Sequence, residues 1–321
     1  MPLPQEWANP VTTRSRVVLE IASELVALHD QPMRQAKVLL KGPGSKDWQL
    51  ALFGSATIEG VEAVVSGDSA LGMINPSTAL RFALLGTAPF TAPQPVRNIA
   101  VIPSLDQCVF VVKADTGLET FEEIKARRYP LKIATRGTRH HSLQFMLEGV
   151  LRAGGISVEE LRSWGGDVIY LGDFPFVTGP EVAAIKRGEI QAMFEEGVDE
   201  WLPVALDAGM RALPFAEETV RTLEAAGYRR ALIRKADFPQ LPADVLTIDF
   251  SGWPIFVHAD APDLLVRQIC AALDARKHLI PWQGEGPLPV ELMSRGTAAA
   301  PIDVPLHPAA ERFWRECGYL S

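Results

Sequence analysis

The sequence has little cysteine and no long apolar run. Its 321 residues include only 3 Cys, which lie far apart, and there is no CxxC motif or Cys/His ligand spacing. Neither a disulfide framework nor a structural zinc site is indicated, and we expect no metal and no cofactor. The longest stretch without a charged residue covers residues 82–96 and is interrupted by prolines. A spanning helix needs about 20 apolar residues, so we expect no direct insertion into a membrane.

Positive charge is also in short supply. The 31 Lys and Arg residues are outnumbered by 39 Asp and Glu residues, which gives a formal net charge of -8. This balance argues against a nucleic-acid partner, because such proteins neutralise phosphates with a broad basic surface. Residues 1–10, MPLPQEWANP, show neither the basic nor the apolar region of a secretory signal, so we expect no signal peptide in this sequence.

The residues that are present predict an α/β fold. Hydrophobic residues make up 47% of the chain, which is enough for a core, and the length suggests about two lobes. Short apolar segments alternate with helical patterns. The most regular helix is predicted to begin at Ser142 and to end at Gly154-Gly155, with apolar positions at Leu143, Met146, Leu147, Val150 and Leu151. Strands are expected at 37–41, 70–74, 99–102, 109–113, 131–134, 168–171, 190–194, 245–250 and 255–258, and further helices at 180–187, from 198, and over 265–273.

The order of these elements indicates two interleaved lobes. Residues 1–111 and 248–321 are expected to form the first lobe, which is discontinuous, and residues 112–247 the second. The chain would then cross twice between the lobes. A cleft between them is the default position for a ligand.

One turn concentrates basic side chains. Residues 135–142 lie between a predicted strand and the most regular helix, and they include Arg136, Thr138, Arg139 and His140. A helix N-terminus offers unpaired N–H groups and a positive dipole end, and arginine adds donors suited to a carboxylate or phosphate. The alternative is a solvated loop, but the density of basic side chains favours anion binding.

Two further turns follow predicted strands in the first lobe. Gly54 and Ser55 lie in a glycine-containing turn that can expose N–H groups to a carboxylate. Asn75 and Ser77 follow a strand end, where open α/β sheets place ligand contacts. Ordinary turn chemistry explains both equally well.

The fourth candidate is acidic. Glu195 and Glu196 follow the strand predicted at 190–194. One carboxylate can receive a ligand ammonium group or act as a general base near His140. Alternatively, both complement the dipole of the following helix.

Taken in order, these motifs resemble the TAXI family of TRAP-transporter solute receptors, which have the type 2 periplasmic-binding-protein fold. Four stretches carry the resemblance: FGSATIEGVEAVVSGDSALGMINPSTA (53–79), KIATRGTRHHSLQFMLEGVLRAGGIS (132–157), IKRGEIQAMFEEG (185–197) and LHPAAERFWRECG (306–318). The resemblance implies two α/β lobes, each with a mixed five-stranded sheet, that close on a small organic anion and deliver it to TRAP membrane subunits in the periplasm.

The resemblance also implies which residues face the cleft: Gly54, Ser55, Asn75, Thr138 and Glu196. Arg136, Arg139 and His140 depart from the small residues that are usual in this family, which suggests a strongly anionic ligand such as a di- or tricarboxylate or an aromatic acid. The polar, proline-rich residues 1–10 also depart from the family, whose members begin with an exported signal and an apolar strand.

Two hypotheses follow. The first is a solute-binding protein that captures a small carboxylate by closure of its lobes, with no catalytic residues. The second is a cytoplasmic enzyme of the same fold, such as a decarboxylase of an aromatic carboxylic acid. In that case His140 would be the acid or base and Arg136 the carboxylate anchor. The absence of a catalytic motif favours the first, and the absence of a signal peptide favours the second.

Overall fold

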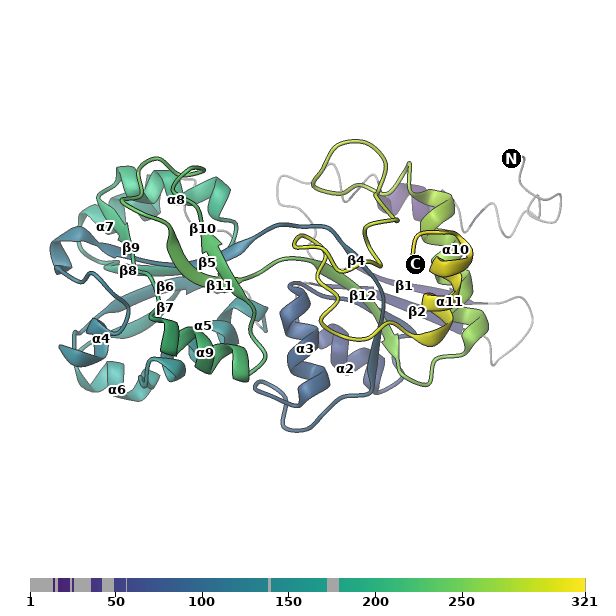
Figure 1. The fold of residues 1–321 in the computed structure, drawn as a ribbon, viewed down its shortest axis with the longest axis horizontal. Coiled ribbons are helices and arrows are strands. Elements are labelled where there is room, and N and C mark those ends of the chain that lie inside the picture. The colour runs from purple at the N-terminus through teal and green to yellow at the C-terminus, as the bar shows by residue number, and fades with distance from the viewer. Residues whose placement is uncertain are drawn as a thin grey trace.

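The structure is a computed structural model with two separate β-sheets, one in each of two lobes joined by a narrow waist (Figure 1). It describes residues 14, 17–23, 25, 36–41, 49–55, 57–137, 140–171 and 179–320. The two-lobed α/β fold expected from the sequence is present. The last strand of the first sheet comes after all strands of the second.

The first sheet has five strands in the order β1-β2-β3-β12-β4. Its strands are β1 (Ala36–Lys41), β2 (Gln49–Gly54), β3 (Leu71–Met73), β4 (Val96–Ile102) and β12 (Trp253–His258). The β2/β3 pair is parallel, and the β1/β2, β3/β12 and β12/β4 pairs are antiparallel. The expected mixed five-stranded sheet is therefore found in this lobe.

The second sheet has seven strands, not the five expected. They are β5 (Gln107–Lys113), β6 (Lys132–Arg136), β7 (Asp167–Leu171), β8 (Ala192–Glu195), β9 (Met210–Ala212), β10 (Arg230–Ile233) and β11 (Val245–Asp249). The order is β10-β11-β5-β8-β6-β7, with β9 also paired to β5. The short strands β9 and β10 escaped the sequence analysis because neither has the continuous apolar run of a buried strand.

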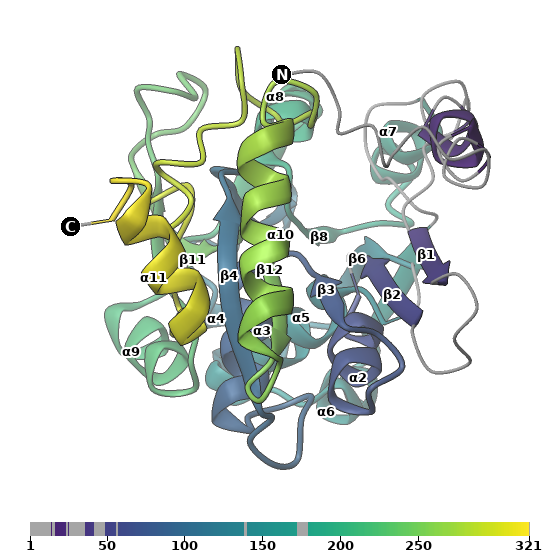
Figure 2. The ribbon, with the colours of Figure 1, turned by 90° about the vertical axis from the view of Figure 1, so that its right-hand side faces the viewer.

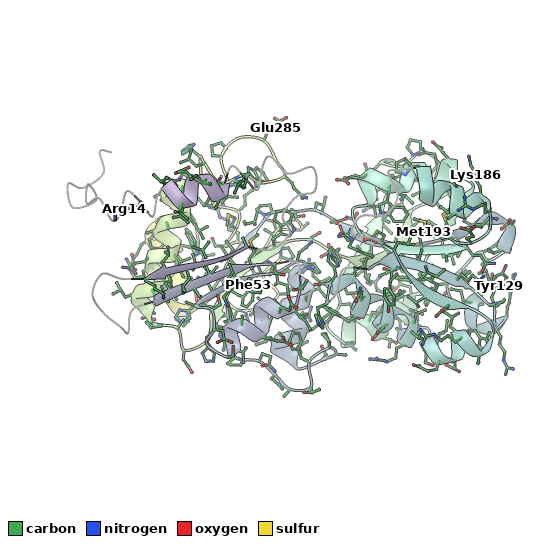
Figure 3. All side chains as sticks on the ribbon, turned by 180° about the vertical axis from the view of Figure 1, so that it is seen from behind. Arg14, Phe53, Tyr129, Lys186, Met193 and Glu285 are labelled. Carbon is green, nitrogen blue, oxygen red and sulfur yellow. The ribbon has the colours of Figure 1, made fainter. Side chains whose placement is uncertain are left out.

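Helices cover both faces of each sheet. They are α2 (Glu59–Val65), α3 (Ser77–Leu85), α4 (Glu123–Ala126), α5 (Ser142–Ala153), α6 (Val158–Ser163), α7 (Gly179–Lys186), α8 (Val198–Asp207), α9 (Glu217–Ala225), α10 (Asp263–Arg276) and α11 (Pro308–Glu316), with the 3-10 turn η2 (Ala114–Thr116). In the first lobe α2 and α3 pack on one face, and α10 and α11 pack on the other (Figure 2). Side chains fill the space between the layers, with Phe53 in the first lobe and Met193 in the second (Figure 3).

Strand β5 shows why the second lobe has three layers. Its residues from Cys108 to Val112 are completely buried. Cys108 and Phe110 face the core beneath α5 and α9, whereas Val109 and Val111 face the core beneath α7 and α8. A strand buried on both faces must be apolar throughout, and this is the pattern that predicted it.

The most regular predicted helix is confirmed as α5. It begins at Ser142, and its five predicted apolar positions are at most 2% exposed. The side chain of His141 caps it, because Nδ1 accepts a hydrogen bond from the N–H of Leu143 at 3.2 Å. This cap fixes the direction in which the basic turn enters the helix.

The chain crosses between the sheets twice, after Ile102 and after Asp249. The two crossings are hydrogen-bonded to each other, because Ser251 Oγ accepts from the N–H of Asp106 at 2.9 Å and donates to its carbonyl at 3.0 Å. Strand β5 begins at Gln107 in the second sheet, a few residues before the domain boundary predicted at 111. The division into residues 1–111 with 248–321 and residues 112–247 stays a prediction.

Candidate functional site

The predicted site residues of the two lobes meet where the lobes touch. Thr57 forms an antiparallel bridge with His141, and the N–H of Ile58 donates to the carbonyl of His140 at 3.4 Å. The turn after β2 therefore contacts the turn before α5. These segments are far apart in the sequence, and the fold brings them together.

The turns of the first lobe contribute three of the predicted residues. Gly54 is the last residue of β2, so the turn begins only at Ser55, whose hydroxyl lies 2.8 Å from that of Thr57. The carbonyl of Asn75 accepts from Ser142 Oγ at 2.5 Å, which joins the lobes a second time. The side-chain Oδ1 of Asn75 is buried and has no hydrogen-bond partner in the part of the chain that the structure describes.

Ser77 has a different position. It is 1% exposed, its hydroxyl donates to the carbonyl of Pro301 at 2.7 Å, and its N–H donates to the carbonyl of Ser251 at 3.1 Å. These bonds tie the start of α3 to the crossing and to the segment after α10. The hydroxyl is thus engaged inside the first lobe rather than across the cleft.

In the basic turn, His140 and Arg136 are described, whereas the predicted site residues Thr138 and Arg139 lie outside the described residues. His140 has φ 59, a left-handed backbone conformation that residues other than glycine adopt infrequently. Such conformations persist where the surroundings hold them in place, and they concentrate at functional sites. Here the backbone bond from Ile58 holds it.

Arg136 does not point at open solvent as an anion anchor would. It is 2% exposed, and its Nη2 lies 2.8 Å from Oε1 of Glu195 and 2.5 Å from Oε1 of Glu196. Its Nη1 lies 3.3 Å from Nε2 of His141. The guanidinium is therefore already paired with two buried carboxyl groups.

The register of the sheet produces this cluster. Strands β6 and β8 are parallel neighbours with Ala134 opposite Met193. Two residues further along each strand, Arg136 and Glu195 reach the same edge of the sheet. The strand ends were both singled out in the sequence, but their adjacency depends on the order of strands.

Asp106 in the first crossing adds a third carboxylate. Its Oδ1 and Oδ2 each lie 3.0 Å from the N–H of Gly197, which directly precedes α8. Burial raises the pKa of Asp106 well above its usual range, and the nearby charge of Glu196 raises it further. Sequence reasoning missed this residue, because a lone aspartate between two apolar strands gives no signal of its neighbours.

Glu195 is a buried carboxyl with a strongly raised pKa. It is 1% exposed, and its Oε2 has no hydrogen-bond partner among the residues described. Burial raises the pKa of Glu195 to about 8, although the charge of Arg136 opposes the rise. Glu195 and Glu196 share one guanidinium, and Asp106 lies close to Glu196, so a carboxyl that keeps its proton near neutral pH relieves their mutual repulsion.

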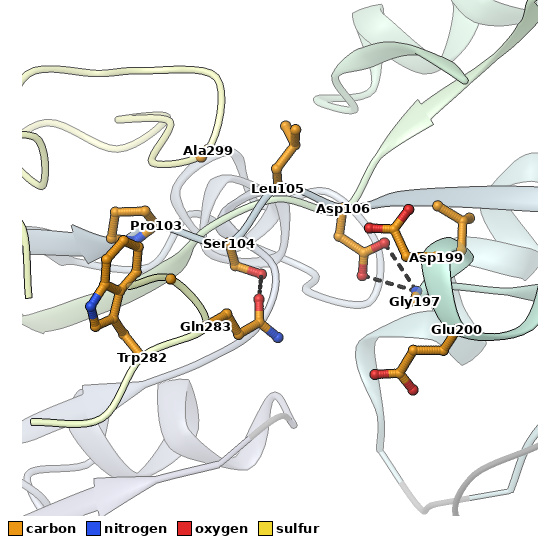
Figure 4. Close-up of a pocket in the computed structure, with 12 residues that line it drawn as sticks. Pro103, Ser104, Leu105, Asp106, Gly197, Asp199, Glu200, Trp282, Gln283 and Ala299 are labelled. Carbon is orange, nitrogen blue, oxygen red and sulfur yellow. Dashed lines mark hydrogen bonds between the residues drawn. The ribbon is translucent and has the colours of Figure 1, made fainter. Parts of the chain in front are cut away.

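A pocket of about 530 Å³ opens beside the first crossing (Figure 4). It is lined by residues 103–106 of the crossing, by 197–200 at the start of α8, and by 282–284 with Ala299 from the segment after α10. Both lobes contribute to it. Its volume lies within the range of about 300–1,000 Å³ that is usual for small-molecule sites.

The described part of the chain lacks two features that would point to other functions. No group of three or more His, Cys, Asp or Glu side chains there is arranged to hold a metal ion. Among the same residues, no helix has both the length and the apolar character needed to cross a bilayer.

Several solved structures are similar to this chain at low sequence identity. They include a TctC solute-binding protein from Polaromonas (14% identity, 68% of this chain and 67% of that one, TM-score 0.37). PhnD1 from Prochlorococcus marinus in complex with methylphosphonate is 12% identical, with 82% of this chain and 84% of that one covered and a TM-score of 0.40. The alkanesulfonate-binding protein SsuA from Xanthomonas axonopodis pv. citri bound to MOPS is 18% identical, with 68% of this chain and 59% of that one covered and a TM-score of 0.30.

A family model matches most of the sequence. It is the model of the NMT1-like family, and it matches residues 51–318, from β2 to the end of α11. This match includes both crossings and every predicted site residue. The chain therefore belongs to the NMT1-like family.

Proposed function

We propose that this chain is a solute-binding protein that captures a small organic solute between its lobes. The observation that carries the proposal is the convergence of strand-end turns from both lobes. Thr57 and Asn75 of the first lobe contact His141 and Ser142 of the second. Two hydrogen-bonded crossings connect the lobes, and they form a short hinge about which the lobes can close.

In this proposal residues 1–111 and 248–321 move as one lobe and 112–247 as the other. The solute is the small organic anion predicted from the sequence, and the protein serves a TRAP-type membrane transporter from the periplasm, as in the TAXI family. The described donors for a carboxylate are His140 and the N-terminus of α5, with Arg139 as predicted. Arg136 supports the turn through its two glutamates.

The alternative enzyme is not favoured by a specific observation. It needs Arg136 to anchor a substrate carboxylate, but that guanidinium is buried and paired with Glu195 and Glu196. A role for His140 as acid or base stays a prediction from the sequence.

Calorimetric titration with di- and tricarboxylates and aromatic acids tests the proposal. We expect saturable binding of at least one compound, and a loss of at least about tenfold in affinity in Asn75→Ala and His140→Gly. Glycine is chosen at position 140 because it keeps the left-handed backbone. The exposed His278→Ala is the matched control.

Closure is measured on the same samples by small-angle X-ray scattering. A bound compound should reduce the radius of gyration. If no organic compound binds, whatever its charge, the proposal fails. If one binds equally well to wild type and to both variants, the assigned site is wrong.

A further inference from the structure

The pocket beside the first crossing has a charged wall on the side of the second lobe. Asp106, Asp199 and Glu200 line it, and none of the described lining residues is Lys, Arg or His (Figure 4). The carboxylate of Asp106 is held by the N–H of Gly197. Asp199 and Glu200 are exposed, and neither forms a salt bridge with a described basic residue. The wall is therefore negative, and Asp199 and Glu200 lie in the first turn of α8.

The rest of the lining is uncharged and includes large apolar side chains. Leu105 is 62% exposed although Ile102 and Ser104, close to it in the crossing, are buried. Trp282 and Pro103 lie on the same side as each other, across the pocket from Asp199 and Glu200 (Figure 4). Ser104 Oγ donates to Gln283 Oε1 at 2.8 Å, which fixes this side to the crossing. A surface with an exposed leucine and a partly buried tryptophan beside carboxylates is suited to an amphipathic solute.

The protein behind the charged wall has no surplus positive charge. Glu195 and Glu196 directly precede Gly197, and Arg136 is the described cation that faces them. The 1% exposed Glu195 also carries the Oε2 without a hydrogen-bond partner. Arg136 is already paired with both glutamates, so this buried cluster offers a carboxylate solute no surplus of positive charge. The lining of the cavity favours a cation, and the buried cluster adds no positive charge that would oppose it.

We propose that the pocket binds the positively charged end of a small organic solute, an ammonium group carried on an apolar or aromatic body. The ammonium group would lie against Asp199 and Glu200, and the body against Leu105 and Trp282. This inference rests on the proposed function, the capture of a solute between the lobes. It adds that the part of the solute nearest the crossings carries a positive charge.

Three probes that share one ring isolate the charge: benzylamine, benzyl alcohol and benzoate. Each is titrated against the full chain by ligand-observed NMR. We expect benzylamine to bind at least about fivefold more tightly than benzyl alcohol, with benzoate weakest, because one exposed charge contact contributes about that factor. The advantage should shrink as the salt concentration rises.

Variants locate the contact. Asp199→Asn with Glu200→Gln should bring benzylamine to the affinity of benzyl alcohol, and Trp282→Leu should weaken both probes. Asp207→Asn, at the exposed far end of the same helix, is the control and should change nothing. A melting curve for each variant separates loss of binding from loss of fold.

The outcomes distinguish this inference from the proposed function. Benzoate binding more tightly than benzylamine would overturn the inference while leaving solute binding intact. The inference is also overturned, and solute binding left intact, if benzylamine still binds after the replacement of both Asp199 and Glu200, or if only compounds of the carboxylate panel bind. If neither the probes nor that panel bind, both proposals fail.

Discussion

Replacing Glu195 by glutamine should make the protein more stable at alkaline pH. The side chain is 1% exposed, and burial raises the pKa of its carboxyl from the ordinary 4.5 to about 8, with Arg136 opposing and Glu196 reinforcing the rise. Between these two values the unfolded chain has lost the proton that the folded chain still holds. Stability from this group is therefore fully present below pH 4.5 and is lost as the pH rises toward 8.

The size of the effect follows from the same two values. Each tenfold difference in proton affinity corresponds to about 1.4 kcal/mol, so the free energy of unfolding of the wild type should fall by up to about 4 kcal/mol between about pH 5 and pH 9 through this group. Glutamine resembles the protonated carboxyl and does not titrate. Arg136 keeps its pairing with Glu196 in the variant.

Urea denaturation of both proteins across this pH range measures the effect. The difference in unfolding free energy should grow with pH in favour of Glu195→Gln and should level off above about pH 8. The exposed Glu218→Gln is the control and should run parallel to wild type. If Glu195→Gln also runs parallel to wild type, the carboxyl does not hold a proton in the folded state and the reasoning is refuted.

Three further predictions concern packing and reactivity. Leu147→Ala in α5 should lower the free energy of unfolding by about 3 kcal/mol because it leaves a cavity. Leu264 is 69% exposed, so Leu264→Ala should lower it by less than about 0.5 kcal/mol. Equal midpoints of the two variants in urea denaturation would contradict this. Gly149→Ala should destabilise by about 1–3 kcal/mol because its β carbon would lie 1.8 Å from the hydroxyl of Tyr228, and Tyr228→Phe should recover part of that loss in a double-mutant cycle. A maleimide should label only Cys317 of the 3 cysteines in the folded protein and all of them in urea, as mass spectrometry would show, because Cys108 and Cys270 are buried.

The predicted strands and helices were recovered where burial dictates a periodic pattern. Strand β5 is buried on both faces and α5 on one, and each imposes its own spacing of apolar residues on the sequence. Strand β2 was read as a turn at Phe53 and Gly54, because the described residues of this strand are only half-buried and its alternation is weak.

The candidate site shows the limit of the same reasoning. The sequence by itself determined that strand ends and turns near 54–57, 75–77, 136–141 and 195–197 carry polar residues, because turns and helix starts select for them locally. It could not assign partners. Arg136 was expected to bind an anionic ligand, yet its guanidinium is paired with Glu195 and Glu196.

Only the tertiary structure decided this pairing, because it depends on β6 and β8 being neighbours in register, and their order in the sheet differs from their order in the chain. The crossing at Asp106 and the pocket beside it arise in the same way. Residues 103–106, 197–200 and 282–284 have no local relation in the sequence, and they meet only because two lobes are folded around two hydrogen-bonded crossings.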